Sequence, residues 1–163
     1  MAHAMQHPST YLYENQNYKY SIQVPDKWQA HDHGDGVVVF NSPHAQTTVN
    51  IQTIFTKKAK GHYENVKALM DDFVSQVPKH TQHAKFTDRK PIVLTLSNGT
   101  KLIGESIILT FFENDVSFKQ WQVMLINQDG RLFQAFAYRA PVNDYDLDYK
   151  KAMTMFASWN IDS

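Results

Sequence analysis

A long run of strand-like sequence, divided by three turn signals, limits the folds open to this chain more than any other feature. Asn98-Gly99 is the strongest signal, because a type I′ hairpin turn needs positive φ at both central residues and Asn-Gly tolerates that best. Asp129-Gly130 is a second signal of this kind, and Asn114-Asp115 is a weaker third. The pattern predicts an antiparallel meander with strands at 85–96, 101–112, 117–127 and 131–139.

The second strand of this meander contains residues 107–112, in which both alternate faces are apolar apart from Thr110. An antiparallel sheet with one face in water does not show this pattern, so both faces are expected to be covered. Residues 63–77 have apolar side chains at helical spacing, and Pro78 is expected to stop that helix. A second helix is expected after a cap at Asn143 or Asp144, with its apolar stripe formed by Tyr145, Tyr149, Ala152, Met153, Phe156 and Ala157.

Three further strands are predicted before the first helix, at 18–24, 37–41 and 48–55, with a polar loop at 31–36. Trp28 is expected at the edge of the core. The order of strands, helix, meander and helix predicts an α+β protein, an α/β/α sandwich with a central, mostly antiparallel sheet and helices on both faces. The length of 163 residues suits one domain, placed at 11–163 after a flexible segment, 1–10.

The charge balance argues against several classes of partner. The chain has 16 Lys and Arg against 16 Asp and Glu, and the cations are scattered, so we expect no nucleic acid and no anionic bilayer as partner. Its apolar stretches are much shorter than the ~20 residues of a transmembrane helix. Without cysteine there is no disulfide, thiol nucleophile or Cys-ligated zinc. The first eight residues show no signal-peptide pattern, although a leader could have been removed.

The sequence also lacks the short motifs that mark common catalytic sites. It contains no Gly-rich phosphate loop, no H-E-x-x-H, no G-x-S-x-G and no D-x-D-x-D-G calcium loop. We therefore predict that the chain is not an enzyme, and we assign it no catalytic residue and no cofactor. The acidic residues that stand out are expected to be solvated on helix surfaces or caps: Asp71, Asp72, Asp144, Asp146 and Asp148.

One local cluster, His31-Asp32-His33, has a spacing that can bind a metal ion, since two imidazoles two residues apart on an extended loop can point the same way. Structural zinc normally takes four protein ligands, and no third or fourth ligand can be located here. A solvated loop is the favoured interpretation, so no metal ligand is assigned. Four other histidines are candidates only by residue type: His44, His62, His80 and His83.

The two ends of the chain resemble PsbP-like domains. Residues 18–28 read YKYSIQVPDKW, which is similar to the Y-x-Y-x-I-x-x-P-x-x-W start of those domains, and an apolar strand ending at Phe40 follows. The C-terminal segment, from Tyr138 to Ile161, is similar to the last strand and helix of those domains, which end in S-(F/W)-x-(I/V). The resemblance runs from about Tyr11 onward. Its motifs are structural, so it carries over no catalytic residue.

This resemblance implies a non-catalytic binding or assembly module, since the superfamily includes a photosystem extrinsic subunit, a Ran-binding nuclear transport factor and DcrB-like domains. The leading hypothesis is a bacterial envelope protein, in the periplasm or cell envelope if a leader was removed and otherwise in the cytoplasm. Its protein partner would meet the sheet edge or the loops around Trp28 and His31. The alternatives are a cytoplasmic chaperone for type VI secretion effectors that shelters apolar helices, and a small-molecule or metal-binding domain. The sequence identifies neither the partner nor the oligomeric state.

Overall fold

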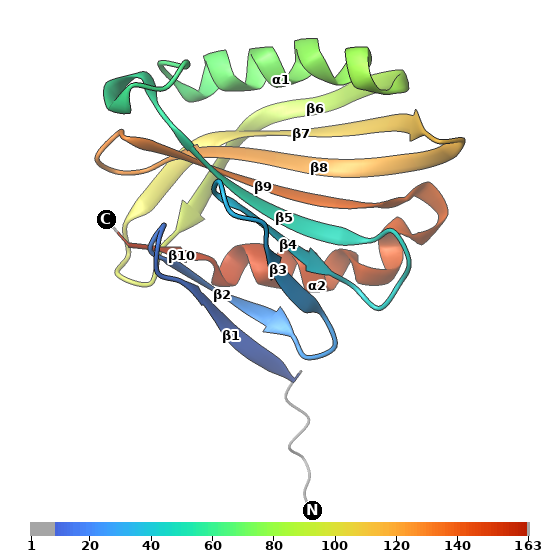
Figure 1. The fold of residues 1–163 in the computed structure, drawn as a ribbon, viewed down its shortest axis with the longest axis horizontal. Coiled ribbons are helices and arrows are strands. Elements are labelled where there is room, and N and C mark those ends of the chain that lie inside the picture. Colours follow the sequence, from blue (N-terminus) through green and yellow to red (C-terminus); the bar gives the residue numbers. More distant parts are fainter. Residues whose placement is uncertain (1–8, 163) are drawn as a thin grey trace, which may run out of the picture.

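Two antiparallel sheets and two α-helices make up the fold, seen in a computed structural model that describes residues 9–162 (Figure 1). The large sheet has seven strands in the order β3-β4-β5-β9-β8-β7-β6, and the small sheet has the order β1-β2-β10. The elements in chain order are β1 (Thr10–Asn15), β2 (Tyr20–Pro25), β3 (Gln29–Asp32), β4 (Val37–Asn41), β5 (Thr48–Phe55), a 3-10 turn η1 (Lys57–Ala59), α1 (Val66–His80), β6 (Gln82–Thr95), β7 (Lys101–Glu113), β8 (Val116–Ile126), β9 (Leu132–Pro141), a 3-10 turn η2 (Val142–Asp144), α2 (Tyr145–Ser158) and β10 (Asn160–Ile161).

The large sheet separates two hydrophobic cores. Helix α1 contacts β6, β7 and β8 on one face, whereas α2 contacts β9 and the small sheet on the other, as Figure 1 shows. The core on the α1 side includes Leu69 and Met70, and the core on the α2 side includes Trp28, Phe136 and Trp159. The predicted α+β sandwich with helices on both faces of an antiparallel sheet is confirmed. The small sheet on the α2 side was not predicted.

The meander is confirmed, but the turn types differ from the prediction. Gly99 has positive φ and Asn98 does not, and Leu96 accepts from the amide of Gly99, so this is a three-residue loop with glycine at its left-handed position. The type I′ pattern instead occurs at Asn114 and Asp115, which both have positive φ between the paired ends of β7 and β8. Asx side chains tolerate the left-handed region, so glycine is not required there.

Several strand predictions agree closely with the structure and others need correction. The bounds predicted for 37–41 and 48–55 are those of β4 and β5. The loop expected at 31–36 begins later, because His31 and Asp32 pair with β4 as the end of β3. Of the segment predicted to be flexible, residues 1–8 lie outside the described residues, whereas Thr10 pairs with Pro25 as the first residue of β1.

Helix α1 is shifted toward the C-terminus relative to the prediction. It begins at Val66 because the side chain of Asn65 accepts a hydrogen bond from the amide of Ala68, at 2.8 Å, and so caps the helix. Pro78 does not stop the helix and lies inside its last turn. A proline there removes few intrahelical hydrogen bonds, and the hydroxyl of Thr81 donates to the carbonyl of Val77 at 2.8 Å.

Both faces of β7, the neighbour of the edge strand β6, are covered over only part of its length. Ile107, Leu109 and Phe111 are buried beneath α1, as the apolar pattern predicts. On the opposite face Phe112 is 39% exposed, because α2 contacts β9 and does not extend over this end of β7. The expectation that both faces are fully covered here was therefore wrong at the end nearest the β7–β8 turn.

Candidate functional site

A cavity lies between α2 and the open end of the β1–β2 hairpin, and we call it the hairpin cavity. It has a volume of about 560 Å³, and most of its lining is apolar. This size is in the range of pockets that hold small ligands or the anchoring side chain of a partner. It is lined by Ser9, Thr10, Gln23, Pro25, Asp26, Lys27, Trp28, Pro43, Lys150, Lys151, Thr154 and Met155.

The hairpin wall is held in place by main-chain and aromatic contacts. Pro25 pairs with Thr10 at the end of β2, and the amide of Asp26 donates to the carbonyl of Ser9 at 3.1 Å. The chain then turns inward at Trp28, which is 2% exposed, so Trp28 is a core residue and not the edge residue that the sequence suggested. The carbonyl of Trp28 accepts from the hydroxyl of Tyr11 at 2.9 Å, which ties β1 to this turn.

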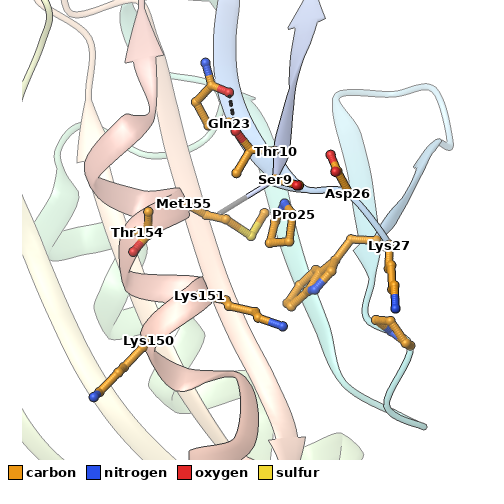
Figure 2. A pocket seen from close by; sticks show the side chains of 12 residues that line it. Ser9, Thr10, Gln23, Pro25, Asp26, Lys27, Lys150, Lys151, Thr154 and Met155 are labelled. Carbon is orange, nitrogen blue, oxygen red and sulfur yellow. Dashed lines mark hydrogen bonds between the residues drawn. The ribbon is translucent and has the colours of Figure 1, made fainter. Parts of the chain in front are cut away.

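Helix α2 supplies the opposite wall. Figure 2 shows Lys151 and Met155 extending from α2 toward Pro25, with Lys27 on the far side of the gap. The end of the cavity nearest the C-terminus of α2 is closed by a hydrogen bond from the amide of Gln23 to Ser158 Oγ, at 3.0 Å. The cavity thus combines α2 with the hairpin and the Pro43 loop, which lie more than one hundred residues earlier in the sequence.

The lining carries more positive than negative charge, with three lysines against one aspartate. Lys27, Lys150 and Asp26 form no ion pair with any residue in the range 9–162. Lys151 is partly balanced, because its Nζ lies 4.0 Å from Asp148 Oδ1. A cavity with apolar walls and a cationic rim favours a ligand that combines apolar surface with negative charge.

Beside the cavity, Asp148 anchors the loop that carries Pro43. Asp148 is 1% exposed, and its Oδ2 accepts from Ser42 Oγ at 2.5 Å and from His44 Nδ1 at 2.8 Å. His44 is 48% exposed, so its outer ring nitrogen faces solvent. Hydrogen bonds to an ionised carboxylate are among the stronger ones, and these two hold the Pro43 wall against α2.

These residue types are those of a serine hydrolase triad, but their geometry is not. A triad places the imidazole between the hydroxyl and the carboxylate, so that the histidine takes the serine proton. Here Ser42 and His44 both contact the same oxygen of Asp148, and Ser42 Oγ also accepts from the amide of His44 at 3.0 Å. The serine proton therefore points at the aspartate. The arrangement is a structural anchor for the loop.

Burial of Asp148 corrects the sequence prediction, which placed it in solvent. The inward stripe of α2 consists of Tyr145, Asp148, Ala152, Met155 and Phe156, whereas the predicted stripe included Tyr149, Met153 and Ala157. The apolar pattern alone does not identify this stripe, because one of its positions is Asp148, a charged residue whose partners Ser42 and His44 come from another loop.

The other acidic residues lie at or near the surface. Asp71 forms an ion pair with Lys67, at 2.8 Å, and with Arg89, also at 2.8 Å. These two cations lower the pKa of Asp71, with Lys67 the larger cause. Asp72 accepts from the hydroxyl of Tyr63 at 2.6 Å, which raises the pKa of that tyrosine. Asp144 precedes α2 without a capping bond from its side chain, and Asp146 is exposed.

Buried tyrosines around the α2-side core have raised pKa values. Burial is the main cause for Tyr20, Tyr138 and Tyr145, and the charge of Asp148 adds to the effect at Tyr138. The hydroxyl of Tyr138 donates to the carbonyl of Tyr145 at 2.6 Å. These hydroxyls therefore stay protonated well above neutral pH, and the three tyrosines serve as core side chains.

The histidine pair singled out in the sequence is exposed and separate from the hairpin cavity. His31 lies in β3, and His33 follows it in a turn where Asp32 Oδ1 accepts from the amide of Gly34 at 2.8 Å. Within residues 9–162, no group of three or more His, Asp or Glu side chains is arranged to hold a metal ion. Metal binding by this pair stays an untested hypothesis.

Most residues of the hairpin cavity were not found by sequence reasoning. Trp28 was named as part of a partner-binding loop, but Ser42, Lys150, Lys151 and Thr154 had no signal, since their meeting depends on how α2 crosses the small sheet. His44 was a candidate only by residue type. Within the described part of the chain, no helix has the length and apolar character needed to cross a membrane.

Comparison with known proteins finds similarity in structure but not in sequence. No protein family and no curated protein matches the chain by sequence. Cyanobacterial PsbP (CyanoP) from Synechocystis superposes with a TM-score of 0.66 at 14% identity, over 99% of this chain and 98% of that protein. LpqN of Mycobacterium tuberculosis, described as involved in cell envelope biogenesis, gives 0.61 at 15% identity, over 95% and 91%. The Saccharomyces cerevisiae Ran-binding protein Mog1p gives 0.59 at 10% identity, over 95% and 96%.

These comparisons define the class of fold. The chain has the PsbP-like fold over nearly its whole length, which confirms the resemblance inferred from its two ends. At such low identity the likeness concerns the fold, and function has to be argued from the site.

Proposed function

We propose that this protein is a non-catalytic binding or assembly module that holds a protein partner at the hairpin cavity. The observation that carries the proposal is the cavity itself, which has apolar walls and a rim of lysines, two of them without ion-pair partners in the described range. The residues around it lack the geometry of a nucleophilic site, because Ser42 and His44 share one oxygen of Asp148. Binding is the function that this arrangement supports best.

We also propose that the protein acts in the bacterial cell envelope. This part rests on the structural similarity to LpqN, whose description refers to cell envelope biogenesis. Support for a protein partner comes from the similarity to Mog1p, which is described as a Ran-binding protein. A chaperone that shelters whole apolar helices would need a long apolar groove, whereas the hairpin cavity is short and carries lysines.

Small-molecule binding is a second candidate, because a volume of about 560 Å³ also suits a compact ligand. Native mass spectrometry of the purified protein distinguishes the two candidates. A co-purified small molecule that is present in the wild type and lost in Thr154→Trp, which fills the cavity, would favour this second function over a protein partner.

Site-specific photocrosslinking tests the leading proposal. A benzoylphenylalanine at Thr154, which is exposed and lines the cavity, is compared with the same group at Ser75, an exposed position on α1. In cells that produce the protein naturally, we expect a discrete protein adduct from position 154 and none from position 75. The partner, identified by mass spectrometry and purified, should bind wild type and Ser75→Trp but not Thr154→Trp. No protein adduct at 154, or binding unchanged by Thr154→Trp, would contradict the proposal.

A further inference from the structure

We infer that the hairpin cavity binds an acidic peptide segment with an apolar side chain at its centre, an inference that rests on the proposed protein-binding function. The first reason is charge. Lys27 stands on the hairpin side and Lys151 extends from α2 toward it, so cations flank the cavity on both walls. Lys150 also lines the cavity from α2, with its amino group directed away from the hairpin, and Asp26 is the only carboxylate among the described lining residues. Complementary charge at a rim steers partners and selects among them.

The second reason is the apolar centre between these cations. Pro25 and Pro43 present its accessible apolar surface, next to the buried side chains of Trp28 and Met155. Pro25 and Trp28 are fixed by main-chain hydrogen bonds of the hairpin and its turn. Anchoring residues at interfaces typically fill such pockets, whose walls keep their shape when the partner is absent. A leucine or phenylalanine side chain of the partner would remove this apolar surface from water.

The third reason is the shape of the α2 wall. Leu147, Lys151 and Thr154 share one stripe of the helix, because they are spaced by four and three residues. Leu147 is 59% exposed and lies one turn before Lys151 on this stripe, toward the N-terminus of α2, whereas the hydrogen bond between Gln23 and Ser158 lies at the C-terminal end of the helix. The stripe from 147 to 154 is about 10 Å long at a rise of ~1.5 Å per residue, which matches about three residues of extended chain.

A peptide fits this lining better than a lipid does. Ser9, Thr10, Gln23 and Thr154 place hydroxyl and amide groups among the apolar side chains, and a peptide main chain can use such donors and acceptors. The side chains of Thr10 and Gln23 bond each other at 3.0 Å, as the dashed line in Figure 2 marks, and are exposed. An acyl chain would leave these polar groups without partners when it displaced their water.

Fluorescence polarisation with defined probes tests the inference. The main probe is a fluorescein-labelled peptide with a central leucine-phenylalanine pair flanked by glutamates, and the control peptide has lysines in place of the glutamates. Sodium dodecanoate is added as a competitor that represents a lipid. We expect the acidic peptide to bind and to weaken with added salt, and the lysine peptide not to bind.

Charge-reversal variants locate the binding. Lys27→Glu/Lys150→Glu changes two lysines that form no ion pair in the described range, so the fold should be kept. Lys79→Glu/Lys85→Glu makes the same charge change at exposed positions of α1 and β6, which are absent from the cavity lining. Affinity for the acidic peptide should fall about tenfold in the first variant and by less than about twofold in the second. Lys27→Gln/Lys150→Gln, which removes charge without reversing it, should give a smaller loss.

The results of these experiments distinguish a failure of the acidic-peptide inference from a failure of the proposed protein-binding function. Equal binding of both peptides, equal losses in the two charge-reversal variants, or binding of dodecanoate without the acidic peptide would overturn the inference. If the crosslinked partner binds wild type and Lys27→Glu/Lys150→Glu equally but fails to bind Thr154→Trp, the proposed function stands and the acidic segment is wrong. If neither the peptide nor a crosslinked partner is found, both fail.

Discussion

Each face of the large sheet is covered by one helix, but the hydrophobic cores on the two faces differ in size. On the α1 side the helix lies directly on the strands, and only Leu69 and Met70 of α1 are fully buried. On the α2 side the small sheet adds another layer, and the core contains Trp28, Phe136 and Trp159. The face with the added layer has the larger core and also the hairpin cavity of about 560 Å³, whereas the pocket between α1, β6 and β7 measures about 380 Å³.

This difference shows where a binding site can arise in such a fold. A helix that packs directly on a sheet leaves little space between them, whereas a helix that also meets a second sheet leaves gaps where three elements join. The hairpin cavity lies at such a junction, between β1, β2 and α2. The paired aspartates on the two sides also differ in burial, since Asp148 is buried on the α2 side and Asp71 is exposed on the α1 side.

Truncation of one phenylalanine on each face should have the largest effect and the clearest contrast. Phe156 is 8% exposed and packs edge-on against Trp121 and Phe136, with ring centroids 5.1 and 5.4 Å away. We expect Phe156→Ala to lower the free energy of unfolding by about 3–5 kcal/mol. Phe73 is only partly buried on α1, so Phe73→Ala should cost less than about 3 kcal/mol. Urea denaturation measures the free energy of unfolding of both variants. Equal losses would mean that Phe73 is as deeply buried in its core as Phe156 is.

Loss of a partner of Asp148 should have an intermediate effect. Ser42→Ala or His44→Ala removes one hydrogen bond to a buried carboxylate, for which we expect a loss of about 1.5–3 kcal/mol. The loss for His44→Ala should lie at the lower end of this range, because water can enter the space left by the half-exposed ring and bind to Asp148. His62→Ala, an exposed histidine just before α1, is the matched control and should change stability by less than about 0.5 kcal/mol. Equal urea midpoints for His44→Ala and His62→Ala would show that Asp148 needs no such partner.

The sequence predicted the fold better than the site, for physical reasons. Strands such as β4 and β5 could be placed because alternation and turn residues are local signals, and the PsbP-like ends supported the overall order. Burial of Asp148 could not be predicted, because its partners Ser42 and His44 come from a loop about one hundred residues earlier. The hairpin cavity likewise depends on long-range packing. Pro78 was misjudged because a proline in the last turn removes one amide donor without ending the helix, which continues to His80.

The smallest predicted effect concerns the exposed charge network on the α1 side. Lys67 and Arg89 lower the pKa of Asp71 below its ordinary value of 3.8. A carboxylate whose folded-state pKa is lowered stabilises the protein above its unfolded pKa, and that contribution is lost as pH falls through the folded value. The difference in unfolding free energy between wild type and Asp71→Asn should therefore be small at neutral pH, should shrink as pH falls below about 3.8 and should disappear below the lowered folded-state pKa. Asp115→Asn, in the β7–β8 turn, makes the same charge change away from this network. Two results would show that the ion pairs joining α1 to β6 add nothing to stability. One is a difference in unfolding free energy for Asp71→Asn that persists unchanged into acid, and the other is an equal difference for Asp115→Asn. The expected effect is small because exposed ion pairs are often worth little.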